Sequence, residues 1–245
     1  MEKRCSDWFE SWFDSPYYKM LYSHRSASEA ELFIINLLAH IQLPPGSHVL
    51  DLACGRGRHS LQMHKAGYNV LGIDLSKESI AEAKALSQPG LTFEVADMRY
   101  FELNQQFDAV MNLFTSFGYF DEMADNTLVL QRIHNHVKTN GLFIMDFFNA
   151  VWVQEQMVEK QEIQREHISF HISKHIEDDI MMKSIDFSDN GKEYHFEEHV
   201  RLIKPNTLKT MIEEAGFNIV RTFGNYSMSD FDEHSSDRII IIATK

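Results

Sequence analysis

The sequence predicts an α/β domain of the doubly wound type, in which helices cover both faces of a mostly parallel sheet. From residue 48 onwards, short apolar segments alternate with segments whose apolar residues recur at helical spacing. This alternation is typical of βαβ units, which lay parallel strands side by side. The chain has 245 residues, 44% of them hydrophobic, which is enough for one such domain with an inserted segment.

Each element follows from its own stretch of sequence. Glycine, proline and asparagine mark the turns, as in Pro89-Gly90 and Asn140-Gly141. Helices are expected over residues 58–66, 76–86, 122–137 and 205–215. Strands are expected over residues 48–52, 70–73, 91–95, 107–113, 142–147, 217–223 and 238–244. The consecutive isoleucines at positions 239 to 242 suit a strand that is buried on both faces.

Two segments do not follow this alternation. Residues 1–44 have helical periodicity, and Pro44-Pro45-Gly46 ends that stretch. Residues 163–203 alternate apolar and polar side chains with period two, around hairpin turn signals at 188–191, and a polar helix over 151–161 precedes them. We expect residues 1–245 to form a single domain, with 1–44 as a helical cap and 163–203 as a small antiparallel sheet that covers the substrate.

Charge and cysteine content narrow the class of partner. The chain holds 36 acidic and 23 basic residues, a formal net charge of −13. This charge repels phosphate backbones and anionic lipids, so neither a nucleic acid nor a membrane is expected as a partner. Cys5 and Cys54 are the only cysteines and lie far apart in the sequence, which favours a reducing cytoplasm. We therefore expect a cytoplasmic monomer or homodimer that acts on a small-molecule substrate.

Three histidines share one face of a predicted strand, at positions 167, 171 and 175. The ligands of one metal ion lie about 2 Å from it. Residues four apart on a strand are separated by about 13 Å. No metal site is therefore expected.

The strongest functional signal is the loop that joins the first predicted strand to the following helix, Asp51-Leu52-Ala53-Cys54-Gly55-Arg56-Gly57. Glycines at 55 and 57 permit a tight turn and a close approach of the backbone to a ligand. Asp74 ends the second strand, where a carboxylate can accept hydrogen bonds from both hydroxyls of a ribose. The loop, its context and this acid together predict a nucleoside-containing cofactor.

Two cofactor classes share this arrangement. A dinucleotide site usually has a third glycine where this chain has Ser60, and Asp51 would repel a pyrophosphate. S-adenosylmethionine has no phosphate, and its ammonium group suits Asp51. The methyl donor therefore fits better than a nicotinamide dinucleotide. The alternatives are a nicotinamide-dinucleotide dehydrogenase and a non-catalytic module that binds S-adenosylmethionine.

The segment from Asp51 to Gly57 resembles the first motif, Asp-x-Ala-x-Gly-x-Gly, of the class I S-adenosylmethionine-dependent methyltransferases. Asp74 and Ala96-Asp97-Met98 resemble later motifs of that family, and the likeness covers about residues 16–149 and 200–245. It implies a Rossmann-like seven-stranded sheet whose last strand runs antiparallel between the fifth and the sixth. It also implies that the cofactor is bound by Tyr18, Arg25, Asp51, Ala53, Cys54, Gly55, Gly57, Asp74, Leu75, Asp97, Met98, Leu113 and Phe114.

Within this family, Asp97-Met98-Arg99 and Leu113-Phe114-x-Ser116-x-Gly118 resemble the N-methyltransferases of amino sugars. Those enzymes carry a histidine after the glycine of the loop that follows strand four, whereas this chain has Tyr119. The implied reaction is in-line methyl transfer to an amine or hydroxyl of a small molecule. Tyr119 is the candidate catalytic residue and would orient the acceptor by a hydrogen bond. Walls around the sulfonium are expected from Phe114, Phe117 and Phe120.

Overall fold

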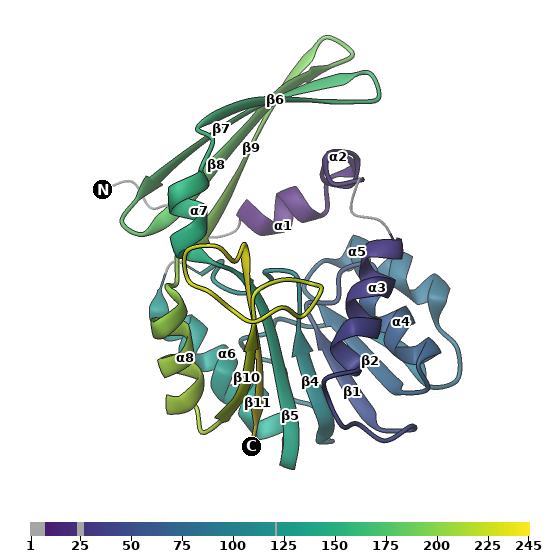
Figure 1. Cartoon of the computed structure of the whole chain (residues 1–245). Coiled ribbons are helices and arrows are strands. Elements are labelled where there is room, and N and C mark those ends of the chain that lie inside the picture. The colour runs from purple at the N-terminus through teal and green to yellow at the C-terminus, as the bar shows by residue number, and fades with distance from the viewer. Residues whose placement is uncertain (1–7, 24–26, 121) are drawn as a thin grey trace.

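A seven-stranded sheet forms the centre of the molecule (Figure 1). The computed structural model describes residues 8–23, 27–120 and 122–245. The strands lie in the order β10-β11-β5-β4-β1-β2-β3. Their bounds are β1 His48–Leu52, β2 Asn69–Asp74, β3 Leu91–Val95, β4 Phe107–Asn112, β5 Val137–Phe148, β10 Asn218–Phe223 and β11 Arg238–Thr244. Strands β1 to β5 pair in parallel, and β11 runs antiparallel to both β5 and β10. The predicted sheet with a reversed last strand is therefore confirmed.

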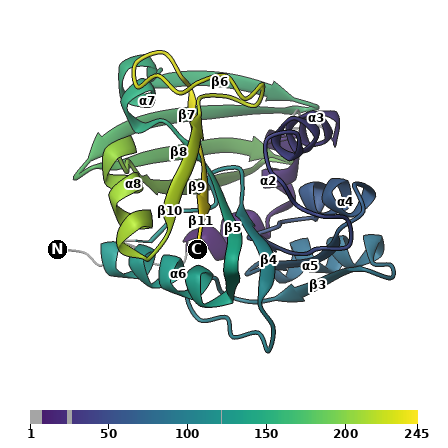
Figure 2. The same cartoon turned by 60° about the horizontal axis from the view of Figure 1, so that its bottom comes forward.

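Helices cover both faces of this sheet, as the sequence predicts. On one face lie α3 (Ala27–Leu38), α4 (Arg58–Lys65) and α5 (Lys77–Ala83), the last followed by the short helix η1 (Lys84–Leu86). On the other face lie α6 (Met123–His136) and α8 (Pro205–Glu214). Figure 2, in which the bottom of the molecule is tilted toward the viewer, shows α6 and α8 on one side of the sheet and α4 and α5 on the other.

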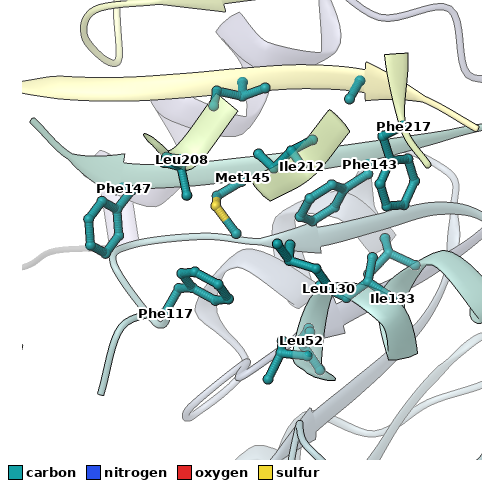
Figure 3. Packing of buried hydrophobic residues seen from close by; sticks show 14 of the residues in the cluster. Leu52, Phe117, Leu130, Ile133, Phe143, Met145, Phe147, Leu208, Ile212 and Phe217 are labelled. Carbon is teal, nitrogen blue, oxygen red and sulfur yellow. The ribbon is translucent and has the colours of Figure 1, made fainter. Parts of the chain in front are cut away.

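The isoleucines of β11 contribute side chains to the hydrophobic cores on both faces of the large sheet. Ile239 and Ile241 pack with the residues of α6 and α8, whereas Ile240 and Ile242 pack with those of α3 and α4. Successive side chains of a strand point to opposite faces, so a central strand needs an apolar residue at every position. Figure 3 shows the first of these cores, where Met145 and Phe143 of β5 meet Leu208 and other side chains of the two helices.

A second, four-stranded antiparallel sheet is inserted after β5, in the order β6-β7-β8-β9. Its strands are β6 Lys160–Arg165, β7 Ile168–Glu177, β8 Ile180–Asp189 and β9 Lys192–Arg201. The preceding helix α7 spans Ala150–Gln156, so it ends earlier than the sequence suggests and the sheet begins earlier. The boundary is hard to predict because Ile163 is the only apolar residue of β6, which leaves the period-two pattern without a hydrophobic signal.

Two short helices, α1 (Trp8–Phe13) and α2 (Pro16–Leu21), lie between the two sheets (Figure 1). Their apolar side chains pack on the inner face of the small sheet, against residues such as Phe170 and Phe187. The third helix of the segment predicted as a cap, α3, belongs instead to the core of the large sheet. The part of the N-terminal segment that covers the strand ends is therefore α1 and α2.

A buried polar cluster joins α1 and α2 to the small sheet. The carboxylate of Glu198 in β9 accepts hydrogen bonds from Trp12 Nε1 at 2.7 Å and from the Tyr22 hydroxyl at 2.6 Å. Its other oxygen lies 3.2 Å from Lys183 Nζ. Burial alone would raise the pKa of Glu198, but the lysine and the two donors outweigh burial and hold this pKa below its ordinary value. On the opposite side, Lys19 of α2 pairs with Glu82 of α5 at 3.0 Å.

No helix within the described part of the chain is both long enough and apolar enough to cross a membrane.

Candidate active site

A cavity of about 510 Å³ lies at the carboxyl ends of β1, β2, β3 and β4. The loops after these strands form its floor and sides, and residues of α1 and α2 form its cover. Pockets of about 300–1,000 Å³ are typical for cofactors and small molecules. In open α/β sheets such pockets lie between two neighbouring strands whose following connections run in opposite directions. Here these strands are β1, which leads to β2, and β4, which leads to β5.

The loop after β1 adopts the tight turn that its glycines predict. Ala53 and Gly55 both have positive φ, 60° and 54°, and both line the cavity, as does Cys54. A Cβ atom at Gly55 would meet no atom within 4 Å, so the backbone there borders open space. Burial raises the pKa of the Cys54 thiol well above its ordinary value. The thiol therefore stays protonated and lines the cavity as a neutral side chain.

Gly57 has a different function from Gly55. It precedes α4 with φ 78° and does not line the cavity. A Cβ atom there would lie 2.6 Å from Cζ of Phe93 in β3. Glycine at 57 is therefore required by packing between the loop and the sheet, and the structure does not place it as a ligand contact.

Asp74 faces the cavity from the end of β2. Its Oδ2 accepts a hydrogen bond from the Gly55 amide at 2.8 Å, and its Oδ1 accepts one from the Ser76 amide at 2.8 Å. Burial raises its pKa, although these two amides oppose that effect. Because each carboxylate oxygen can accept two hydrogen bonds, Asp74 can still accept two from a ligand. Leu75 lines the cavity beside it.

Asp97 and Met98 line the cavity after β3. The Asp97 carboxylate is held in place by Arg99, whose Nη2 lies 2.6 Å from Oδ2 and whose Nε lies 3.1 Å from both oxygens. This pairing fixes the orientation of the acid next to the cavity. The arrangement can accept a further donor, such as an exocyclic amino group.

Asp51 lies beneath the loop and not on the cavity wall. It is 1% exposed, and the hydroxyl of Ser60 donates a 2.5 Å hydrogen bond to its Oδ2. Burial raises its pKa to about 6, with a smaller contribution from the charge of Asp74. Among the described residues, no lysine or arginine forms an ion pair with it, and the charge of Arg58 opposes the rise of its pKa only weakly.

The loop after β4 forms the opposite wall. Leu113 and Phe114 line the cavity, and both Phe114 and Thr115 have positive φ, at 65° and 56°. This region costs a non-glycine residue about 1–2 kcal/mol, so the loop is held in place by its surroundings. Ser116 Oγ donates to the Leu113 carbonyl at 2.9 Å.

Of the three phenylalanines expected to wall the sulfonium, Phe114 and Phe120 line the cavity but Phe117 does not. Phe117 is fully buried and packs edge-on against Phe147, with ring centroids 6.4 Å apart (Figure 3). The expectation for Phe117 is therefore wrong. Gly118, at φ 81°, turns the chain between Phe117 and Tyr119, which places these two side chains on different sides of the loop.

Aromatic side chains surround the far end of the cavity, which we call the aromatic end: Phe9, Phe13, Tyr18, Tyr119 and Phe120. The Tyr119 ring lies 5.6 Å from that of Phe13, and Phe13 lies 5.0 Å from Tyr18. The Tyr119 hydroxyl donates its proton to the Thr115 carbonyl at 2.5 Å. Its oxygen can therefore act toward a ligand as a hydrogen-bond acceptor.

The structure brings together most of the residues predicted from the sequence. Arg25 lies outside the described residues. The sequence reasoning missed Phe9, Phe13 and His59, all of which line the cavity. Burial lowers the pKa of His59 to about 3, helped by the nearby Arg58 and Arg238, so its imidazole is neutral at pH 7. Its position directly after the glycine loop was the available signal. Within the described residues, no three His, Cys, Asp or Glu side chains are arranged to hold a metal ion.

The raised pKa of Asp51 predicts a stability difference that depends on pH. Its folded-state pKa of about 6 exceeds the ordinary 3.8, so the stabilisation from its bound proton is complete below pH 4 and is lost as pH rises through 6. Asp51→Asn cannot ionise. Between pH 4 and pH 8, the free energy of unfolding of the variant relative to wild type, measured in urea, should therefore rise by about 2.5 kcal/mol, at about 1.4 kcal/mol per pKa unit. An equal difference at both pH values would contradict the raised pKa.

Comparison with known proteins gives the family. A protein-family model described as a methyltransferase domain matches residues 43–216 of this chain. A glycine/sarcosine N-methyltransferase of Aphanothece halophytica is 24% identical over 233 residues, which cover 90% of this chain and 83% of that protein. The dTDP-3-amino-3,4,6-trideoxy-alpha-D-glucopyranose N,N-dimethyltransferase of Streptomyces venezuelae is 28% identical over 137 residues, 54% of this chain and 57% of that protein.

Solved structures share the fold. A S-adenosylmethionine-dependent methyltransferase from Clostridium acetobutylicum matches with a TM-score of 0.79 and 22% identity, over 93% of this chain and 95% of that one. The matched domain model spans the glycine loop, Asp74, Asp97 and the loop after β4, so it includes most of the cavity floor. The chain therefore belongs to the methyltransferase domain family and is an enzyme of the S-adenosylmethionine-dependent class, as its sequence predicts.

Proposed function

We propose that the enzyme methylates an amine nitrogen of a small molecule, which binds at the aromatic end of the cavity. The observation that supports this most is the absence of a general base there. The described lining residues include two carboxylates, Asp74 and Asp97, and one imidazole, His59. Asp74 accepts hydrogen bonds from backbone amides, and Asp97 is paired with Arg99. His59 has a pKa of about 3, so it is a weak base. A neutral amine can attack without a base, whereas a hydroxyl needs one to take its proton.

The order of the strands orients the cofactor within the cavity. Asp74 and Asp97 follow β2 and β3, whereas Gly55 and Leu113 follow β1 and β4. Asp74 can accept hydrogen bonds from the ribose, and Asp97 with Met98 can meet the adenine. The adenosine half then lies over β2 and β3, and the methionine half lies over β1 and β4. When bound, S-adenosylmethionine supplies an activated methyl group on its sulfonium.

Asp51 suits the ammonium group of the methionine half. It lies at the end of β1, beneath the loop that carries Gly55, and burial leaves it destabilised as an anion. An approaching cation, directly or through a water molecule, offsets that penalty. Ser60 keeps the carboxylate oriented by its 2.5 Å hydrogen bond. Cys54 and Ala53 complete this side of the wall.

At the aromatic end, the side chains of this chain exclude water and favour the neutral form of an amine. Phe9, Phe13 and Phe120 offer no hydrogen bond to a protonated amine, and burial disfavours its charge. The Tyr119 oxygen can accept a hydrogen bond from the amine N–H, because its own proton is donated to Thr115. Methyl transfer moves the positive charge of the sulfonium onto the amine nitrogen, and the aromatic faces can stabilise this one charge on either atom, whereas a protonated amine would add a second.

The names of the relatives support nitrogen as the acceptor atom. One methylates glycine or sarcosine and the other a nucleotide-linked amino sugar, by their names. An amino acid would need a cation for its carboxylate. Among the described residues, three cations line the cavity: Lys19 and Arg56 both pair with Glu82 at 3.0 Å, and Arg58 pairs with Glu29 at 3.3 Å. The aromatic end therefore favours an amine with an apolar or ring-shaped body over an amino acid.

Asp74 provides the most direct test of the cofactor position. Asp74→Ala removes two acceptor oxygens for the ribose, and hydrogen bonds to charged groups contribute about 1.5–3 kcal/mol each. The affinity for S-adenosylhomocysteine, measured by calorimetry, should fall at least tenfold. Glu94→Ala removes an exposed acid from β3 and should bind as wild type does. An unchanged dissociation constant in Asp74→Ala would place the ribose elsewhere.

Paired acceptors test the amine assignment. Wild-type enzyme is incubated with S-adenosylmethionine and with amines that each have an alcohol of the same skeleton, such as amino sugars and their parent sugars, and S-adenosylhomocysteine is quantified. Turnover is expected with amines and not with the matched alcohols. With the best amine, Tyr119→Phe should lower kcat and leave the affinity for S-adenosylhomocysteine within about twofold. Turnover of the alcohols would refute the amine assignment, and full turnover by the variant would leave the Tyr119 hydroxyl without a catalytic role.

A further inference from the structure

A buried ion pair lies directly behind the loop after β4. Asp146 of β5 is fully buried, and its Oδ1 lies 2.5 Å from Nε of Arg238 at the start of β11. The hydroxyl of Tyr226 donates to its Oδ2 at 3.1 Å. The antiparallel pairing of β5 and β11 brings the acid and the arginine together, since Asp146 is opposite Ile240, two residues after Arg238. Neither charged residue is among those that line the cavity.

This pair holds the loop through three hydrogen bonds. Asp146 Oδ2 accepts from the Phe114 amide at 2.8 Å, and the backbone carbonyl of Asp146 accepts from the Thr115 amide at 3.0 Å. Arg238 Nη2 donates to Thr115 Oγ1 at 2.8 Å. Phe114 and Thr115 are the two non-glycine residues of the loop with left-handed backbone angles. The contacts therefore fall on the residues whose conformation most needs support.

Of the two held residues, Phe114 faces the cavity and Thr115 holds a residue that does. Phe114 lines it, with the guanidinium of Arg58 4.3 Å from its ring centre and that of Arg238 5.7 Å from it. The carbonyl of Thr115 accepts the proton of the Tyr119 hydroxyl. A shift of Thr115 would thus move both the wall at Phe114 and the partner that orients Tyr119.

We infer that Asp146 and Arg238 are positioning residues, which fix the loop over residues 113–119 against the methionine half of the cofactor and against the acceptor. This inference rests on the proposed function, because it takes the methionine half to lie over β1 and β4. Neither residue touches the reacting atoms. They act through the backbone of Phe114 and Thr115.

A buried pair that serves stability alone would behave differently when it is weakened. Weakening such a pair would lower the free energy of unfolding and would reduce the affinity for every ligand of the cavity alike. A positioning pair loosens one loop and weakens the contacts of that loop selectively. The adenosine half, held at Asp74 and Asp97, offers an internal reference.

The experiment compares Asp146→Asn with wild type by two readouts. Hydrogen exchange of the segment 113–119, followed by mass spectrometry, should become at least tenfold faster, while exchange in β2 and α6 stays unchanged. In calorimetry, the affinity for S-adenosylhomocysteine should fall at least fivefold. The affinity for 5′-methylthioadenosine, which lacks the amino-acid tail, should stay within about twofold of wild type. Asp237→Asn makes the same chemical change at the exposed neighbour of Arg238 and should behave as wild type does.

Thr115→Val provides a milder second variant that keeps the branched shape and removes only the bond from Arg238. Thr115→Val should speed the exchange of 113–119 and lower the affinity for S-adenosylhomocysteine, as Asp146→Asn does. Thr115→Ser retains the hydroxyl and should match wild type in both measurements. If Asp146→Asn fails to fold, the threonine pair decides the question. Unchanged exchange of 113–119, or equal loss of both ligands, would overturn the inference. A wild-type protein that binds neither ligand would instead overturn the proposed function, and the exchange rates would still test whether the pair holds the loop.

Discussion

The parallel pairing of β1 with β2 on one side and with β4 on the other is the constraint on which the candidate site depends. Leu52 pairs with Ile73, and Asp51 pairs with Met111, so three strands end at the same edge. The loops that follow them must then converge, whatever their sequences. The connection after β1 runs toward β2 and the connection after β4 runs toward β5, so a crevice opens between β1 and β4, and α1 and α2 close it from the small sheet.

Two buried acids in the apolar strands show how the chain distributes charge around this crevice. Asp146 has a cationic partner within the chain, Arg238, and the pair supports a strained loop. Asp51 has Ser60 as its hydrogen-bond partner and a pKa raised to about 6, and among the described residues no lysine or arginine forms an ion pair with it. A ligand with an ammonium group can supply a cationic partner. The same physics thus gives one acid a structural role and leaves the other suited to binding.

The sequence predicts the large sheet well because its strands are apolar runs bounded by turn residues, and the isoleucines of β11 could only be buried on both sides. It predicts less well where a residue has two possible environments. Phe117 and Phe120 look alike in sequence, yet the turn at Gly118 sends Phe117 to the core. Gly57 shares a motif with Gly55 but serves packing against Phe93. The sequence does carry a signal for Asp146, since an acid within an apolar strand requires a partner.

The central claim is that the cavity holds S-adenosylmethionine with its adenosine over β2 and β3 and its methionine half over β1 and β4. A crystal structure of the enzyme with S-adenosylhomocysteine tests this most directly. The account predicts both ribose hydroxyls within hydrogen-bond distance of the Asp74 carboxylate, and the ammonium group on the side of Asp51 and the 113–119 loop. A ligand bound in the reverse direction, with its adenine against Phe114, or one bound outside this cavity, would contradict it.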